Sequence, residues 1–429
     1  MKNLRAASSF ASLAVIAVTV GACSKTTSAP ASPTNTCSTQ LSSQVCAASD
    51  PAPAGTSFTA LTGNNVMPFT IGSNCPGLGS VGCSPNVPFV SVTICTPGSA
   101  TQCQTVGNVL LDTGSYGLRI FGSLISGVTS TEYKVAGSPV GECAEFGSAN
   151  TWGSVERYDL QIDGQTLSNF PVQQIDNAFS GGAPASSICA EMGSVSGPAD
   201  PNANFNGILG VGMGLADQQS YFVCASAGHC TPVDISTAYQ VQNPVPSLTT
   251  DNNGILLELP QVPQGGQGSV TGYLAFGIGT QSNNKPSNWG VSSVYKADGS
   301  LQMRTTYGSQ QYSSFIDSGS NANYVPICSN TSGFLAPTCS VNLDATNMGA
   351  SDVSGTDLTF QVGNANSLFG SGNWAFNNLA GTAFNYPGVG LVFDWGLPFF
   401  YGRTVFVGVT GKKASGGELG SATGPYWAY

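Results

Sequence analysis

VLLDTGS at residues 109–115 and FIDSGS at residues 315–320 are two similar stretches of this chain. Each runs from apolar residues into an aspartate, which is followed by Thr or Ser, then Gly, then Ser. One such tetrapeptide would mean little in a chain with 55 glycines. Two copies, each at the end of an apolar segment and separated by roughly half of the chain, indicate an internal duplication.

Short β-type segments surround both motifs. The chain has 429 residues with 55 Gly and 25 Pro, which favour turns and short strands over long helices. No long stretch keeps the 3.6-residue apolar period of a helix. We therefore predict a mostly β protein, with strands that include residues 66–72, 87–94, 109–111, 158–162, 272–277 and 404–408.

The duplicated motif resembles that of the pepsin-like aspartic proteases, in which each of two β lobes donates one Asp to a shared cleft. Three further segments are similar to that family in kind and in order: FNGILG at 205–210, GYLAFGIG at 272–279 and WGLPFFYGRTVF at 395–406. The chain also looks like a group of bacterial exported proteins without an assigned activity.

The resemblance covers roughly residues 61–410. It implies a bilobal pepsin-like fold with pseudo-twofold symmetry, with an N-terminal β lobe at residues 61–280 and a C-terminal β lobe at residues 281–429. It also implies an aspartic-type endopeptidase. Fold alone does not fix activity, so a second function stays open, a catalytically inactive pepsin-like surface or binding lipoprotein.

The resemblance assigns the catalytic pair to Asp112 and Asp317. Two close carboxylates cannot both ionise cheaply, so they share one proton. The ionised member can act as general base on a water, and the protonated member can hydrogen-bond the scissile carbonyl and later help to protonate the leaving amine. We expect no cofactor and no metal, and the single histidine of the chain, His229, fits a mechanism without a His-activated nucleophile.

The residues around each aspartate have supporting roles by the same resemblance. Glycine allows the backbone to approach the carboxylates closely, as expected for Gly114 and Gly319. Hydroxyls that hold the two loops together are expected on Thr113 and Ser318. Hydroxyls that bond the outer carboxylate oxygens are expected on Ser115 and Ser320.

The family covers its cleft with a hairpin flap that bears a tyrosine. In this chain the matching region spans residues 142–155, where Phe146 and Trp152 are the two candidates for the flap aromatic. A flap Phe lacks the hydroxyl, so any hydrogen bond made there in the family is in doubt. The alternative is that both aromatic side chains simply pack the hairpin.

One residue departs from the family pattern. Asp394 lies two positions before Gly396, where the family has an apolar residue. An unpaired charge buried at that position would be costly. Three explanations stay open: a shifted register, a surface loop, or a paired carboxylate.

The N-terminus has the pattern of an export signal. A basic start, MKNLR, precedes the apolar residues 11–20 and the sequence VGAC at 20–23, which resembles a bacterial lipobox. We predict a lipoprotein signal peptide at 1–22, lipidation of Cys23, and a flexible tether at 23–60 that is rich in Ser, Thr, Ala and Pro. The resemblance implies outer-membrane anchoring, and an ordinary signal peptide with a chance cysteine is the alternative.

The cysteine count agrees with export. There are 13 cysteines, so twelve remain if Cys23 carries lipid, and an exported chain can oxidise these to disulfides. Closeness in sequence suggests the pairs 37/46, 75/83, 95/103, 224/230 and 328/339, with 143/189 left over.

Charge and composition limit the partners. The chain has 12 Lys and Arg against 22 Asp and Glu, a formal net charge of −10. We therefore expect no nucleic-acid partner, because no basic surface is available to neutralise phosphates. The expected partners are a peptide or protein substrate and a membrane, reached through the N-terminal lipid. We expect a monomer.

Overall fold

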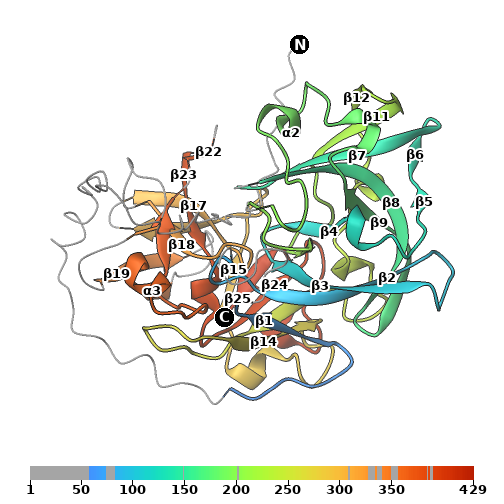
Figure 1. The fold of residues 1–429 in the computed structure, drawn as a ribbon. Helices are drawn as coiled ribbons and strands as arrows, with labels where there is room; N and C mark the ends of the chain where they lie inside the picture. The colour runs from blue at the N-terminus through green and yellow to red at the C-terminus, as the bar shows by residue number, and fades with distance from the viewer. Residues whose placement is uncertain are drawn as a thin grey trace, which may run out of the picture.

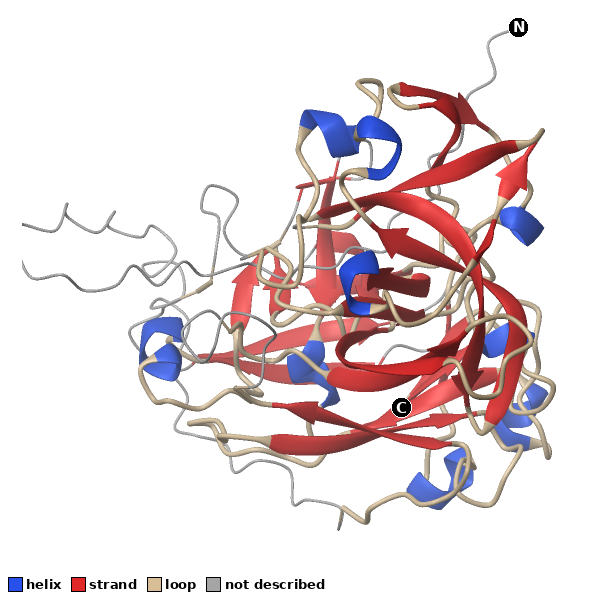
Figure 2. Cartoon of the chain, turned by 45° about the vertical axis from the view of Figure 1, so that its right-hand side comes forward, coloured by secondary structure: helices blue, strands red, loops and turns tan. Residues whose placement is uncertain are grey.

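The computed structural model describes residues 58–73, 83–147, 149–200, 202–307, 310–326, 334–335, 341–348, 356–383, 385–386 and 390–429. The predicted signal peptide, Cys23 and nearly all of the predicted tether lie outside these residues. Strands dominate the described part and the helices are short (Figure 1, Figure 2). The mostly β class is confirmed.

One extended sheet contains strands from the beginning, middle and end of the chain. Its members are β1 (Val66–Ile71), β2 (Phe89–Cys95), β3 (Cys103–Asp112), β4 (Tyr116–Phe121), β5 (Thr131–Glu132), β6 (Lys134–Val135), β7 (Ser138–Glu145), β8 (Asn150–Ile162), β9 (Gln165–Ile175), β10 (Gly207–Val211), β11 (Ser220–Ser226), β12 (His229–Val233), β13 (Gly254–Glu258), β14 (Val270–Phe276), β15 (Val294–Lys296), β24 (Thr404–Gly408) and β25 (Tyr426–Ala428).

A second sheet is built from the C-terminal half. Its members are β16 (Met303–Tyr307), β17 (Gln310–Ile316), β18 (Asn323–Val325), β19 (Val341–Met348), β20 (Thr356–Val362), β21 (Ala380–Thr382), β22 (Asn385–Tyr386) and β23 (Gly390–Trp395). The helices of the described part are α2 (Ile188–Glu191) and α3 (Ala365–Phe369), with the 3-10 turns η2 (Gly122–Leu124), η3 (Phe179–Gly181), η4 (Thr237–Tyr239), η5 (Val245–Ser247), η6 (Pro286–Trp289), η7 (Leu397–Phe400) and η8 (Glu418–Ser421).

The two halves repeat one topology. In the first, β10 lies between β3 and β4, parallel to β3 and antiparallel to β4. In the second, β23 lies between β17 and β18, parallel to β17 and antiparallel to β18. In each half the Asp-Thr/Ser-Gly-Ser loop therefore connects the two strands that flank a third. Figure 1 shows the β17–β23 half on one side and the β2–β9 strands on the other.

An antiparallel layer of strands joins the two halves. Its order is β15, β25, β24, β13, β14 and β1, so it combines strands from all parts of the described chain. In Figure 1, β1 and β14 lie below β24 and β25, and β13 pairs with both β14 and β24. One apolar cluster continues through both halves and contains Leu111 and Ile316, each fully buried. The bilobal pepsin-like fold with pseudo-twofold symmetry is thus confirmed.

Two glycines explain why the third strand of each half packs so tightly against its aspartate loop. A Cβ on Gly210 would lie 2.4 Å from the Tyr116 nitrogen, and a Cβ on Gly396 would lie 2.0 Å from the Ala322 oxygen. No real Cβ tolerates such distances, so only glycine fits at either position. These two glycines lie in the segments 205–210 and 395–406, which the sequence marks as similar to the pepsin-like family.

Asn86 links the two lobes directly. Its side-chain nitrogen donates to the carbonyl oxygens of Asn321 at 2.9 Å and Phe376 at 2.8 Å. Its side-chain oxygen accepts from the Phe376 N–H at 2.7 Å and from the Tyr401 hydroxyl at 2.9 Å. Asn86 is fully buried, and its bonds end next to the second aspartate loop, at Asn321.

Three of the predicted disulfides are confirmed: Cys95–Cys103, Cys143–Cys189 and Cys224–Cys230. Cys83 is also disulfide-bonded. Its predicted partner Cys75, and the predicted pairs 37/46 and 328/339, lie outside the described residues. Among the described residues, no helix has both the length and the apolar character needed to span a membrane.

Candidate active site

The two aspartates lie at matching places, Asp112 as the last residue of β3 and Asp317 directly after β17. Both are fully buried. The loops meet face to face, because a Cβ on Gly114 would lie only 2.5 Å from Cγ of Asp317. The missing side chain of Gly114 is therefore what allows the Asp317 carboxyl group to reach the first loop.

Crossed hydrogen bonds fasten the two loops together. The Thr113 N–H donates to Ser318 Oγ at 3.1 Å, and the Ser318 N–H donates to Thr113 Oγ1 at 2.9 Å. Each hydroxyl in turn donates to a strand carbonyl of the other lobe, Thr113 to Ile316 at 3.2 Å and Ser318 to Leu111 at 2.8 Å. All four bonds join residues more than 200 positions apart, so they fix one aspartate relative to the other.

Each carboxyl group receives the same two kinds of donor. The N–H groups of Gly114 and Gly319 donate to Oδ1 of Asp112 and Asp317, both at 2.7 Å. The Ser115 hydroxyl donates to Oδ2 of Asp112 in a short hydrogen bond, and the Ser320 hydroxyl is 2.9 Å from Oδ2 of Asp317. The structure thus brings together the two predicted aspartates and all six residues predicted to support them.

The surroundings favour retention of a proton on the pair. Burial raises the pKa of Asp317 well above its usual range, and the neighbouring carboxyl group of Asp112 raises it further. The Gly319 N–H opposes this shift. Because the two carboxyl groups are coupled, the retained proton belongs to the pair.

Asp394 belongs to this site. It is buried in β23, with 1% exposure, and its Oδ2 lies 2.6 Å from Ser320 Oγ. Ser320 therefore contacts two carboxyl groups, Asp317 and Asp394. Of the three explanations that the sequence left open, the structure shows a carboxyl group paired through a serine. The register of β23 is the pseudo-twofold equivalent of β10, and the residue is not on a surface loop.

The two flap candidates lie in packed clusters. Phe146 follows β7 and is 6% exposed, among apolar residues that include Phe205 and Ile208. Trp152 in β8 is fully buried, and its ring nitrogen donates to the Phe179 oxygen at 3.1 Å. This placement agrees with the alternative in which both aromatic side chains pack the hairpin. A contact of either with a substrate stays a prediction.

The sequence reasoning missed a half-buried residue beside the pair, Tyr116. Burial raises the pKa of its hydroxyl, and the charges of Asp112 and Asp317 raise it further. A Cβ on Gly212 or Gly214 would lie 2.8 Å from its ring, so the ring packs against these two glycines. Its signal in the sequence was its position directly after the first motif. The phenol is neutral at ordinary pH values and can donate a hydrogen bond.

A buried charge network behind Tyr116 was also missed. Arg119 in β4 donates to the backbone carbonyl oxygen of Tyr116 at 2.9 Å and to the Glu142 carboxylate of β7 at 2.7 Å, and it forms a short ion pair with Asp217. Asp217 accepts from the Tyr221 hydroxyl of β11 at 2.6 Å. The Arg119 guanidinium also lies 5.4 Å from the centre of the Phe146 ring. The network therefore connects the first aspartate loop to the β7–β8 hairpin.

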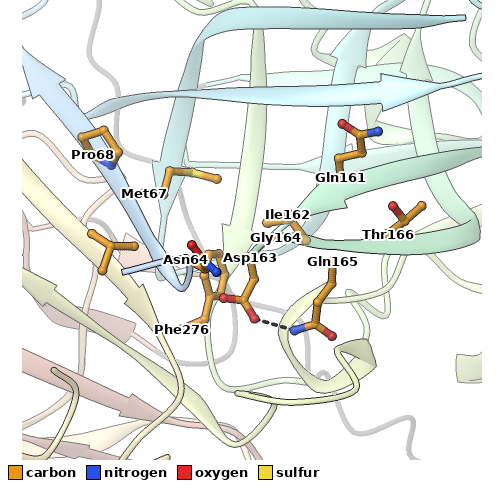
Figure 3. A pocket seen from close by; sticks show the side chains of 11 residues that line it. Asn64, Met67, Pro68, Gln161, Ile162, Asp163, Gly164, Gln165, Thr166 and Phe276 are labelled. Carbon is orange, nitrogen blue, oxygen red and sulfur yellow. Dashed lines mark hydrogen bonds between the residues drawn. The ribbon is translucent and has the colours of Figure 1, made fainter. Parts of the chain in front are cut away.

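A separate pocket of about 490 Å³ lies between β1 and the turn that joins β8 to β9 (Figure 3). Asp163 and Gln165 line it, and the Gln165 amide donates to Asp163 at 2.6 Å. None of the aspartate-loop residues lines this pocket. Within the described part of the chain, no group of three or more His, Cys, Asp or Glu side chains could hold a metal ion.

Two lobes of repeated topology, with one Asp-Thr/Ser-Gly-Ser loop from each meeting at their boundary, define a pepsin-like fold. The chain belongs to the family described as "Protein of unknown function (DUF3443)", whose model matches residues 62–429. No curated protein matches the chain. Among solved structures it is similar to an aspartic proteinase from Irpex lacteus, at 16% identity and a TM-score of 0.45, over 85% of this chain and 96% of that chain. The duplicated loops and the strand order carry the fold assignment.

Proposed function

We propose that this protein is an exported, lipid-anchored aspartic endopeptidase. One observation carries the proposal: the Asp112 and Asp317 loops are locked together by the crossed Thr113 and Ser318 bonds, and the Asp317 carboxyl lies against Gly114. A structural protein would not need two buried carboxyl groups in this arrangement, because burying them without cations is costly. Paired carboxyl groups that share a proton are useful for acid–base chemistry.

The reaction would use one water and one shared proton. The ionised carboxylate takes a proton from the water while the water oxygen attacks the peptide carbonyl carbon. The protonated carboxyl group donates a hydrogen bond to the carbonyl oxygen. When the C–N bond breaks, the departing nitrogen takes a proton from the pair, which returns to its starting state. Both aspartates are required, and no covalent enzyme intermediate forms.

The rival function is a catalytically inactive surface or binding lipoprotein. Two observations favour it: both aspartates are fully buried, and both flap candidates lie in packed clusters. A peptide could reach the pair only after the residues that cover it move aside. Retention of both aspartates, both glycines and all four hydroxyls favours the enzyme.

The test is an assay of the purified mature protein on a peptide library, with cleavage read by mass spectrometry. The proposal expects cleavage that a transition-state peptide inhibitor blocks, with a bell-shaped dependence of initial rate on pH. Its limbs belong to the carboxyl pair, and the raised pKa of Asp317 moves the upper limb toward higher pH. A rate that climbs steadily from pH 5 to pH 9 would contradict the shared proton.

Membrane anchoring is the second part of the proposal and rests on the lipobox at residues 20–23. Lipid chains contribute roughly 0.8 kcal/mol per buried methylene, so several chains together hold a protein on a bilayer. The Cys23→Ser variant is expected to leave the membrane fraction for the soluble one. If it stays with the membrane in high salt, the anchor lies elsewhere.

A further inference from the structure

Asp394 is a buried carboxyl group for which the two-aspartate chemistry has no role. Its Oδ1 has no hydrogen-bond partner, and no salt bridge of the described residues involves it. Its titratable neighbours are Asp317 and Asp112 and, on β18, its bridge partner Tyr324, whose hydroxyl donates to Asn321 at 2.7 Å. An ionised Asp394 would therefore add a second negative charge beside the singly charged aspartate pair, without any compensating cation.

Counting protons at Ser320 shows that one of its two carboxyl neighbours is protonated. Ser320 Oγ lies 2.6 Å from Asp394 and 2.9 Å from Asp317. A hydroxyl has one hydrogen, so it can donate to only one of the two. The second contact is attractive only if that carboxyl group carries its own proton and donates it to the serine oxygen.

The donors around the two groups decide which of them is protonated. Asp317 accepts the Gly319 N–H at 2.7 Å, so its charged form is stabilised whichever way the Ser320 hydroxyl proton points. Asp394 has the contact with Ser320 alone, and its other oxygen is buried without a partner. Burial raises the pKa of Asp394 well above its usual range, against the lowering effect of Ser320 and together with the charge of Asp112. Asp394 is the group that keeps a proton.

We propose that Asp394 is a positioning residue that stays protonated and donates to Ser320 Oγ, so that the Ser320 hydroxyl proton points at Asp317 Oδ2. The proposal rests on the peptidase function proposed above and deepens it. The relay runs Asp394 to Ser320 to Asp317. It directs a hydrogen bond to one aspartate of the pair and thereby makes the two aspartates inequivalent.

The pseudo-twofold supplies an internal comparison. Asp394 pairs with Phe315, two residues before Asp317, and Ile208 pairs with Leu110, two residues before Asp112. Ile208 is therefore the equivalent of Asp394 in the first lobe, and it is fully buried among apolar residues. The relay is present in the second lobe and has no counterpart at Ile208, so it can distinguish Asp317 from Asp112.

Two variants of Asp394 separate the effect of its hydrogen-bond donor from the effect of its packing. Asp394→Leu removes the donor and is expected to lower kcat/KM by about ten- to hundredfold, the scale of one hydrogen bond to a charged group. Rates are measured per active site, titrated with a transition-state peptide inhibitor, and across pH. Asp394→Asn keeps an N–H donor for Ser320 and is expected to restore most of the lost rate. Ile208→Val perturbs packing at the equivalent position and is expected to lower Tm without moving either limb of the pH profile.

Infrared difference spectroscopy of wild type minus Asp394→Asn gives a readout that needs no peptidase activity. The proposal expects the C=O band of a protonated carboxyl group to disappear in the variant. Loss of carboxylate bands instead would overturn it, as would an Asp394→Leu enzyme with unchanged kcat/KM and pH limbs. If the wild type cleaves no peptide, the peptidase proposal fails, and the infrared result alone decides the protonation of Asp394.

Discussion

At the scale of single residues, the site depends on the absence of a side chain at Gly114. A Cβ there would lie 2.5 to 2.7 Å from the three carboxyl atoms of Asp317, so either the carboxyl group or the loop must shift. We predict that Gly114→Ala lowers kcat/KM by about a hundredfold, the effect of misplacing a catalytic group by roughly 1 Å. The control is Gly299→Ala, because a Cβ at Gly299 meets nothing within 4 Å. Equal activity of the two variants would show that the loops do not meet as described.

Residues whose role depends only on their near neighbours in sequence were predictable. The glycines and hydroxyls around each aspartate follow from the motif itself, because the donors to each carboxylate lie two and three positions after it. Asp394 could be identified from the sequence only as a departure, since its contact with Ser320 spans 74 positions. Arg119 and Glu142 carried no signal, because a charged residue in a strand is ordinarily solvent-exposed.

At the scale of elements, the Arg119 network joins β4, β7 and the segment before β11. We predict that Arg119→Met lowers the free energy of unfolding by about 3–5 kcal/mol, because it leaves Glu142 and Asp217 buried without their cation. Burial raises the pKa of Glu142, so this carboxyl group can take up a proton, and the loss should grow as pH rises. Urea denaturation at two pH values measures it.

The control for that prediction is the triple variant Arg119→Met, Glu142→Gln, Asp217→Asn. Its polar groups are neutral, so it should recover much of the lost stability. A single Arg119→Met variant as stable as wild type would mean that the network contributes nothing to the joining of these strands.

Asn86 makes a second link between elements, from the segment before β2 to the second lobe. We predict that Asn86→Ala lowers the free energy of unfolding by about 3 kcal/mol, because Asn321 and Phe376 lose buried hydrogen bonds. Asn86 has a φ of 56°, which Ala also tolerates poorly. Asn86→Gly avoids the backbone strain, but like the Ala variant it lacks the side-chain hydrogen bonds. If the Gly variant is as stable as wild type in urea, the hydrogen bonds of Asn86 do not contribute to the free energy of unfolding.

At the scale of the whole molecule, the described carboxyl groups with a shifted pKa shift almost entirely upward. Burial raises the pKa of Glu142, Asp317 and Asp394, and it raises that of Asp163 to about 7 with help from the charge of Asp251. The exception is Asp200, where burial is outweighed by hydrogen bonds from Asn202 and Ser196. The folded state thus binds more protons than the unfolded chain above about pH 4.

It follows that stability should fall as pH rises. A group whose pKa is raised in the folded state stabilises the protein fully at a pH below its unfolded-state pKa. This stabilisation is lost as pH rises through its folded-state pKa. We therefore predict a higher Tm near pH 4 than near pH 8. Asp163→Asn should remove the part of this slope that ends near pH 7. Thermal unfolding of both proteins across pH measures it. A Tm that rises from pH 4 to pH 8 would show that the pKa values of the buried carboxyl groups are not raised in the folded state.

The whole-molecule fold was predictable because a duplication is visible over long distances. The two motifs mark where each half repeats, and the predicted strands at 66–72, 272–277 and 404–408 correspond to β1, β14 and β24. The sequence could not show that these three strands share one sheet across the two halves. Such pairing depends on contacts between residues more than 100 positions apart, for which no local pattern exists.

The shared proton is tested by peptide cleavage with Asp112→Asn and Asp317→Asn, each compared with wild type and with Asp163→Asn as a distant control. One shared proton needs two carboxyl groups, so we predict that each of the first two variants loses all cleavage while its circular dichroism and Tm show a folded protein. Wild type and Asp163→Asn should both cleave. Cleavage at the wild-type rate by either Asp112→Asn or Asp317→Asn would contradict the account.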